Sequence, residues 1–188
     1  MSEYSLLTII KDRRSIRKFL QQRVSERDIS DIIEAGIHAP SGSNTQCYRF
    51  LIITDKKDID YLGTAKIPIV ANAPVIILAV ADLRDCKYLQ TKRAKVFDKL
   101  PYQDVAMAMQ NMCLLAEAKG LGSCVIHLSE QWHTAKEIKK YFNLQDYHEL
   151  MGMILLGYSN ELVNYEKGSH AGRPIKRKAI EHYILKRR

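Results

Sequence analysis

The sequence of 188 residues contains few glycines and prolines and no apolar run long enough to cross a membrane. Nine Gly and five Pro exclude a collagen-like chain or one dominated by linkers. The longest apolar run, residues 73–81, is far shorter than the ~20 residues that a membrane helix requires. The first residues also lack the basic and apolar regions of a signal peptide. We therefore expect a soluble, cytoplasmic protein.

Cysteine is scarce and scattered, which excludes most metal and disulfide frameworks. The four cysteines form no C-x-x-C pair, and the six histidines lack the spacing of metal ligands. The motifs H-E-x-x-H and G-x-S-x-G are absent. We expect reduced thiols in an intracellular protein, no metal site and no hydrolase triad.

The charge is unbalanced, with 29 Lys+Arg against 21 Asp+Glu and a net charge of +8. Part of the excess forms two clusters near opposite ends of the chain, at residues 13–18 and 173–178. Such clusters favour an acidic partner: a phosphate-bearing cofactor, a nucleic acid or an anionic surface. Hydrophobic residues make up 46% of the chain and no linker divides it, so we expect one domain over residues 1–188.

Hydrophobic periodicity predicts a mixture of helices and strands without strict alternation, which indicates the α+β class. The predicted helices cover residues 25–38, 104–119 and 134–142, with a short C-terminal helix carrying Ile180 and Tyr183. The predicted strands cover residues 50–53, 75–80, 123–128 and 150–156. The helix over 104–119 is apolar on nearly every side, so we expect it to be buried in the core or under a partner subunit.

Three segments have compositions suited to binding. Residues 13–19 combine Arg13, Arg14 and Arg17 with Ser15, which suits a phosphate monoester, although a basic run is also typical of a solvated face. Residues 39–46 are small and polar, so they are either a ligand-binding loop or an ordinary helix-to-strand loop. Residues 120–124 place two glycines between a helix and a strand. In a dinucleotide-binding fingerprint the glycines follow a strand and open a helix, so the order here is the reverse. The alternative to a binding role is a helix cap followed by a tight turn.

Taken together and in this order, these motifs resemble the nitroreductase family of flavin enzymes. The match is carried by residues 13–19, 39–50, 73–75, 104–124, 156–158 and 177–181 and spans almost the whole chain. The resemblance implies a three-layer sandwich with a central, mainly antiparallel sheet flanked by helices. It also implies an intertwined homodimer with two FMN sites at the subunit interface.

The resemblance further implies which residues bind FMN. The segment expected at the phosphate and ribityl end consists of Arg13, Arg14, Ser15 and Arg17, completed by Arg177. The loop expected to reach the isoalloxazine from the partner subunit consists of Pro40, Ser41, Gly42, Ser43 and Asn44. The backbone expected beside the reactive edge of the ring belongs to Ile126, His127 and Leu128. The sequence departs from the family at Cys47, often Pro, at Tyr48, often Trp, and at Ile175, often basic.

The chemistry that the resemblance implies belongs to the flavin. NADH or NADPH delivers a hydride to flavin N5 and leaves, and a nitroaromatic, a quinone or a similar acceptor takes its place in a ping-pong cycle. No catalytic side chain and no metal are expected.

Two alternatives remain open. One is a specialised relative in the same family, namely a flavin-consuming, dehalogenating or ene-reducing enzyme, for which residues 82–101 are the only candidate lid. The other is a basic nucleic-acid-binding module. That module predicts aromatic residues interleaved with the basic patches, yet only Phe19 adjoins residues 13–18.

Overall fold

The computed structural model describes residues 5–64, 67–92, 94–128, 133–161 and 177–185. At its centre lies a four-stranded sheet in the order β1-β2-β4-β3, in which every neighbouring pair is antiparallel. The strands are β1 (Tyr48–Ile53), β2 (Val75–Asp82), β3 (Gly122–His127) and β4 (His148–Gly157). The predicted strands all exist, and β1 begins two residues earlier than expected.

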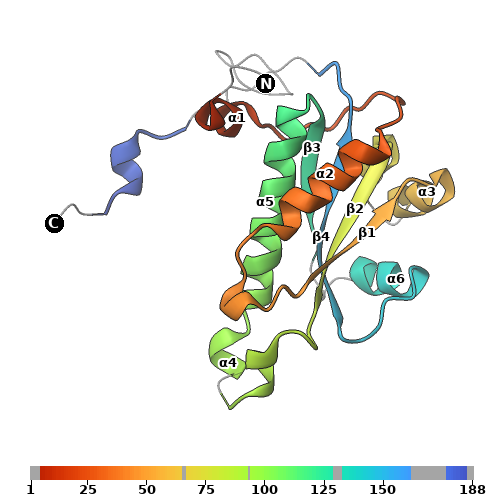
Figure 1. Cartoon of the computed structure of the whole chain (residues 1–188). Helices are drawn as coiled ribbons and strands as arrows, with labels where there is room; N and C mark the ends of the chain where they lie inside the picture. The colour runs from red at the N-terminus through yellow and green to blue at the C-terminus, as the bar shows by residue number, and fades with distance from the viewer. Residues whose placement is uncertain (1–4, 65–66, 93, 129–132, 162–176, 186–188) are drawn as a thin grey trace.

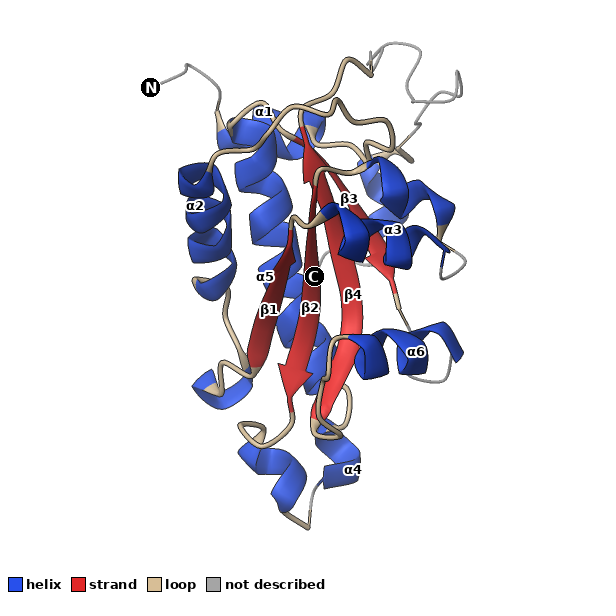
Figure 2. Ribbon diagram, turned by 90° about the vertical axis from the view of Figure 1, so that its right-hand side faces the viewer, coloured by secondary structure: helices blue, strands red, loops and turns tan. Residues whose placement is uncertain are grey.

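Helices cover both faces of this sheet (Figures 1 and 2). The α-helices are α1 (Leu6–Asp12), α2 (Glu26–Ile37), α3 (Lys56–Thr64), α4 (Ala94–Phe97), α5 (Leu100–Ala118) and α6 (His133–Tyr141). The 3₁₀ turns are η1 (Gly42–Asn44), η2 (Pro68–Asn72), η3 (Lys87–Gln90) and η4 (Ile180–Tyr183). Helices α2 and α5 lie on one face, and α3 and α6 lie on the other. The α+β sandwich predicted from the sequence is confirmed.

The core consists of two apolar layers separated by the sheet. All eight residues of β2 are buried, which confirms the buried strand predicted over residues 75–80 from its continuous apolar sequence. Because successive side chains of a strand point to opposite faces, Ile77 and Ala79 pack towards α2 and α5, whereas Ile76 and Leu78 pack towards α3 and α6. The hydrophobic effect therefore holds helices on both faces.

Local sequence signals set the ends of two helices. Ser25 caps α2, because its Oγ accepts a hydrogen bond from the Asp28 amide (3.0 Å) and donates one to the Asp28 carboxylate (2.6 Å). After α5, Gly120 adopts φ +72° and the amide of Leu121 donates to the carbonyl oxygen of Ala116 (2.8 Å).

The structure shifts the start of one predicted helix and adds a helix that was not predicted. Helix α5 begins at Leu100 rather than at residue 104, because Pro101 lies in the first turn, where a proline needs no hydrogen-bond partner. The short C-terminal helix predicted to carry Ile180 and Tyr183 is present as the four-residue 3₁₀ helix η4. Helix α1 was not predicted, although Ser5 caps it through a hydrogen bond from the Thr8 amide.

Helix α5 is not enclosed on all sides by the described part of the chain. Val105, Met109 and Met112 are buried, but Met107 is 37% exposed and Ala106 is exposed beside it. One face of this apolar helix therefore meets solvent in a single chain. No described helix is long and apolar enough to span a membrane.

Candidate functional site

The basic segment 13–17 is joined to the first residues of β3. The amide of Ile16 donates to the carbonyl oxygen of Ser123 (2.9 Å), which forms a parallel bridge between Ser15 and Ser123. The Ile16 side chain is buried against Gly122. Because Ile16 is the buried residue, its neighbours Ser15 and Arg17 remain partly exposed on either side. This bridge places the segment at the start of β3.

Arg13 and Arg14 lie near the C-terminal end of α5. Burial and the nearby Asp12 raise the pKa of Glu117, and the positive charges of Arg13 and Arg14 oppose that rise. An Arg14 guanidinium nitrogen also donates to the Arg13 carbonyl oxygen (3.0 Å). The region around Glu117 therefore combines two guanidinium groups, from Arg13 and Arg14, with two carboxylates, from Asp12 and Glu117 itself.

A carboxylate from the chain after β4 holds the other end of this segment. The amides of Arg17 and Lys18 both donate to Oε2 of Glu161, at 2.9 and 3.2 Å. The Ser159 hydroxyl donates to the carbonyl oxygen of Lys18 (2.6 Å). The basic segment is thus bonded to β3 and to the chain that follows β4. Sequence reasoning missed Glu161, because only the sheet topology brings it next to residues that lie more than a hundred positions earlier.

An apolar pocket of about 400 Å³ lies further along β3, between this strand and α5. Its lining residues are Tyr102, Val105, Ala106, Met109, Gln110, Val125, His127 and Met151. At about 3.3 Å per residue, Val125 and His127 lie about 7–13 Å along the strand from Ser123. A cationic segment therefore lies beside the start of β3, and an apolar cavity lies towards its end.

The three residues predicted beside a flavin ring, two at the end of β3 and Leu128 just after it, divide between two faces. His127 is exposed and lines the pocket on the α5 side. Ile126 and Leu128 point the other way, into the core that includes α6, and Leu128 is fully buried. The side chains of Ile126 and Leu128 therefore do not line the pocket.

The small polar loop lies at the opposite end of α5. Pro40, Ser43 and Asn44 are exposed, while Ser41 and Gly42 are half-buried. Ser41 Oγ accepts a hydrogen bond from the amide of Gln46 (3.0 Å), which closes the loop.

Two neighbours hold this loop against the body of the protein. The phenol of Tyr48, which replaces the family's frequent Trp, lies within hydrogen-bond distance of the carbonyl oxygens of Ile37 (2.9 Å) and Ala39 (3.2 Å). The amide of Gly42 donates to Oδ1 of Asp104 in α5 (3.0 Å). Sequence reasoning missed Asp104, although an acid within an apolar helix was a visible signal.

The candidate lid, residues 82–101, packs beside the same loop. A β-carbon at Gly42 would lie 3.2 Å from Leu100 and 3.7 Å from Tyr88. Cys86 of this segment is buried, as is Cys47 at the end of the loop. Burial is the largest cause that raises the pKa of Cys47, to about 12, so this thiol is a poor nucleophile at neutral pH.

The basic segment and the loop do not meet within one chain. The amide of Gly42 bonds to Asp104. The charge of Arg13 instead opposes the rise in pKa of Cys113 and Glu117, which lie nine and thirteen residues later in α5. At 1.5 Å per residue, these positions are about 14–20 Å apart. The two predicted binding segments therefore lie at opposite ends of the same helix.

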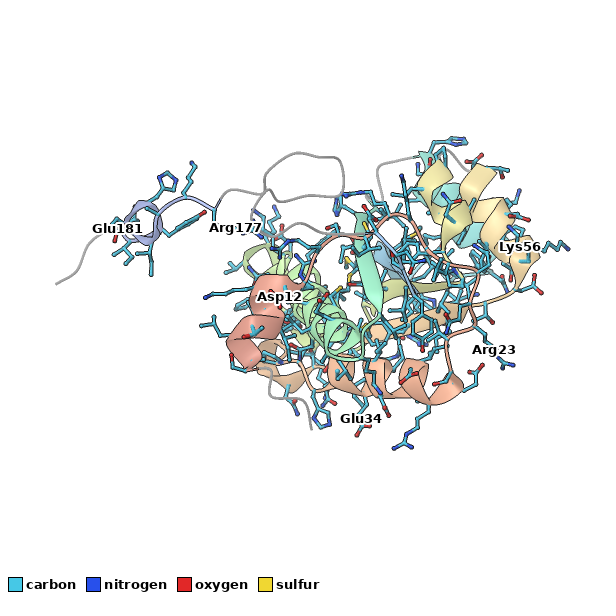
Figure 3. The ribbon with its side chains drawn as sticks, turned by 90° about the horizontal axis from the view of Figure 1, so that it is seen from above. Asp12, Arg23, Glu34, Lys56, Arg177 and Glu181 are labelled. Atoms are coloured by element: carbon cyan, nitrogen blue, oxygen red, sulfur yellow. The ribbon has the colours of Figure 1, made fainter. Side chains whose placement is uncertain are left out.

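The remaining predicted residue, Arg177, is exposed at the start of the C-terminal segment 177–185. Figure 3 shows Arg177 and Glu181 projecting away from the sheet and its helices. Arg173 and Lys176, the other candidates for a phosphate contact, lie outside the described residues, as does Ile175. Among the residues that the structure describes, no group of three His, Cys, Asp or Glu side chains could hold a metal ion.

Comparison with known proteins gives a consistent result. The sequence model described as "Nitroreductase family" matches residues 10–72 and 63–158. A Bacillus subtilis protein provisionally named NAD(P)H nitroreductase YfhC is 28% identical over 181 residues, with 86% of this chain and 88% of that protein covered. An Archaeoglobus fulgidus protein provisionally named NADH dehydrogenase/NAD(P)H nitroreductase is 26% identical over 161 residues, covering 82% and 86%.

Solved structures show the same fold. A Desulfovibrio desulfuricans chain, described as a provisional nitroreductase in complex with FMN, superposes with a TM-score of 0.78. It is 28% identical, and the match covers 100% of this chain and 99% of the other.

Proposed function

The chain belongs to the nitroreductase family, and we propose that it is a single-domain, FMN-dependent oxidoreductase that uses NADH or NADPH as electron donor. Relatives named NAD(P)H nitroreductase and FMN reductase support this assignment, as does the similar structure described with FMN. The proposed acceptors are nitroaromatics, quinones or similar small molecules.

The observation that carries the proposal is the arrangement along β3. Arg13, Arg14 and Arg17 gather where Ser15 bridges to Ser123, and the apolar pocket lies about 7–13 Å further along the strand. FMN has a phosphate at one end and a flat aromatic ring at the other. Its two ends therefore match the arginines at the start of β3 and the apolar pocket further along the strand. We place the phosphate at the arginines and the ring towards Val125 and His127.

When bound, FMN supplies hydride transfer through its N5 atom. The chain's own residues bind and orient it. Guanidinium groups neutralise the phosphate, and main-chain groups of Ile126, His127 and Leu128 direct the ring edge. Met109, Val125 and Met151 exclude water from one side of the pocket. We assign no catalytic side chain.

We further propose that the active unit is a homodimer in which Pro40, Ser41, Gly42, Ser43 and Asn44 serve the partner's site. The exposed face of α5 around Met107 supports the same assembly, because a large apolar surface in water favours association.

The C-terminal segment supports the homodimer independently. Ile180, Tyr183 and Leu185 are all exposed, and η4 stands away from the rest of the described chain (Figure 1). We propose that this segment packs on the partner subunit and brings Arg177 to a phosphate there.

Anaerobic spectroscopy tests the function directly. The protein is purified, its visible absorbance is recorded with and without added FMN, and NADH or NADPH is then added. We expect a flavin band that bleaches with one donor or both, and addition of a nitroaromatic or a quinone should restore it. A protein that binds no FMN contradicts the proposal. A bound flavin that neither donor reduces points to a specialised relative.

A further inference from the structure

A buried carboxylate in α5 organises the loop that we assign to the flavin ring. Asp104 is 1% exposed. Its Oδ1 accepts from the amide of Gly42 (3.0 Å), and its Oδ2 accepts from Oγ1 of Thr45 (3.4 Å) and Sγ of Cys47 (3.9 Å). All three donors belong to one stretch of six residues. Asp104 therefore bonds to the loop at several points rather than at one.

These three partners are uncharged, which is unusual for a buried carboxylate. Burial of an ionised group is unfavourable unless hydrogen bonds or a counter-charge compensate it. Burial, and to a lesser extent the charge of Asp104, raises the pKa values of Cys47 and Tyr48, so both groups stay protonated and able to donate. An apolar residue would fill this position in α5 without any such penalty. The hydrogen bonds to the loop therefore explain why a carboxylate lies at this position.

The loop requires an external anchor because its backbone is strained. Ser43, Asn44 and Gln46 have φ values of 52°, 53° and 49°, in the left-handed region that non-glycine residues rarely occupy. Bonds within the loop, such as the one from the Asn44 amide to the Ser41 carbonyl oxygen (3.0 Å), close the turn but do not attach it to the protein. Asp104 supplies that attachment from the rigid helix α5.

We propose that Asp104 is a positioning residue that holds residues 41–46 in the conformation needed at the flavin ring of the partner subunit. This inference rests on the proposed function. Asp104 itself is buried beneath the loop and acts through Gly42, Thr45 and Cys47.

Asp104→Asn in the full-length chain tests the proposal. The side chain keeps its size, but one acceptor oxygen becomes an amide that opposes the donors on the loop. Asp82→Asn is the matched control, because Asp82 is 2% exposed and its carboxylate accepts from Arg84 rather than from the loop. Thr45→Val removes one donor only and gives a milder second variant if Asp104→Asn fails to fold.

Hydrogen exchange of the flavin-free protein measures loop anchoring without any cofactor. We expect Asp104→Asn to speed exchange of the Gly42 amide and its neighbours through residue 46 by about tenfold or more, because the amide loses a charged acceptor. Thr45→Val should produce a smaller change in the same amides. Unchanged exchange at Gly42, or an equal change in Asp82→Asn, would overturn the proposal.

Flavin binding provides the second measurement. We expect Asp104→Asn to raise the Kd for FMN about tenfold and to shift the flavin reduction potential at saturating FMN, while Asp82→Asn leaves both unchanged. A variant that is only less stable, with normal Kd and potential, would assign Asp104 a purely structural role. Wild-type protein that binds no FMN would instead contradict the proposed function, and exchange at Gly42 would still test the anchor.

Discussion

The side chain of Ile16 occupies the space that a β-carbon on Gly122 would need. An added carbon at Gly122 would lie 2.9 Å from Cγ2 of Ile16 and 3.0 Å from its Cβ. Because Ile16 is branched at Cβ, no rotation of its side chain removes this conflict. The glycine therefore permits the basic segment to pair with β3.

We expect Gly122→Ala to destabilise the protein by about 1–3 kcal/mol, as overpacking does, and to weaken FMN binding by displacing Ser15 and Arg17. Urea denaturation and FMN titration measure the two effects. The double variant Gly122→Ala with Ile16→Ala should be more stable than the sum of the single changes predicts, because the conflict disappears. Additive effects would show that Ile16 and Gly122 are not coupled.

Arg13→Ala should weaken FMN binding because it removes a guanidinium from the proposed phosphate site. Loss of a charge-assisted hydrogen bond corresponds to about a tenfold to hundredfold rise in Kd. Arg23→Ala is the control, since that side chain is 84% exposed and pairs with Glu26 in the adjacent helix. Riboflavin lacks the phosphate, so its binding should be unaffected by Arg13→Ala. An equal loss for FMN and riboflavin would place the phosphate elsewhere.

Stability at acid pH should depend on Asp82. Its carboxylate accepts from Arg84 Nε (2.9 Å) and Nη2 (2.6 Å), and these hydrogen bonds lower the pKa of Asp82 from 3.8 to about 2. Because the folded pKa lies below the unfolded one, the stabilisation is present above pH 4 and is lost as the pH falls towards about 2. Its size is about 1–2 kcal/mol, allowing for solvent around Arg84.

Urea denaturation of wild type and Asp82→Asn at a series of pH values checks this prediction. The difference in unfolding free energy should be constant near neutrality and should shrink by about 1–2 kcal/mol between pH values of about 4 and 2. Comparison with Asp82→Asn cancels the contributions of other carboxylates. A difference that stays constant through the acid range would show that Arg84 does not perturb Asp82.

Tyr183→Ser should weaken the proposed homodimer. The Tyr183 ring is 63% exposed in the single chain, so an interaction with a partner would bury apolar area that serine lacks. Sedimentation equilibrium should show a larger dimer dissociation constant for Tyr183→Ser, whereas Tyr183→Phe, which keeps the ring, should resemble wild type. Wild-type protein that sediments as a monomer would contradict the two-subunit site.

Local sequence determined most of the elements of this protein. The apolar run of β2 is a buried strand, Ser25 caps α2 and Gly120 ends α5, because strand burial and helix caps depend on residues close together in the chain. The order of motifs also identified the family and the α+β sandwich. The predicted start of α5 at residue 104 was wrong, because Pro101 suits a first helical turn and the helix begins at Leu100.

Tertiary structure decided how the motifs are placed and what holds them. Only the strand order brings Glu161 to the amides of Arg17 and Lys18, and only the packing of α5 carries Asp104 to the loop at Gly42. The pairing of Ser15 with Ser123 is equally invisible in the sequence. These relationships join residues about 60 to 140 positions apart, which no local pattern encodes because chain folding, not propensity, determines such contacts.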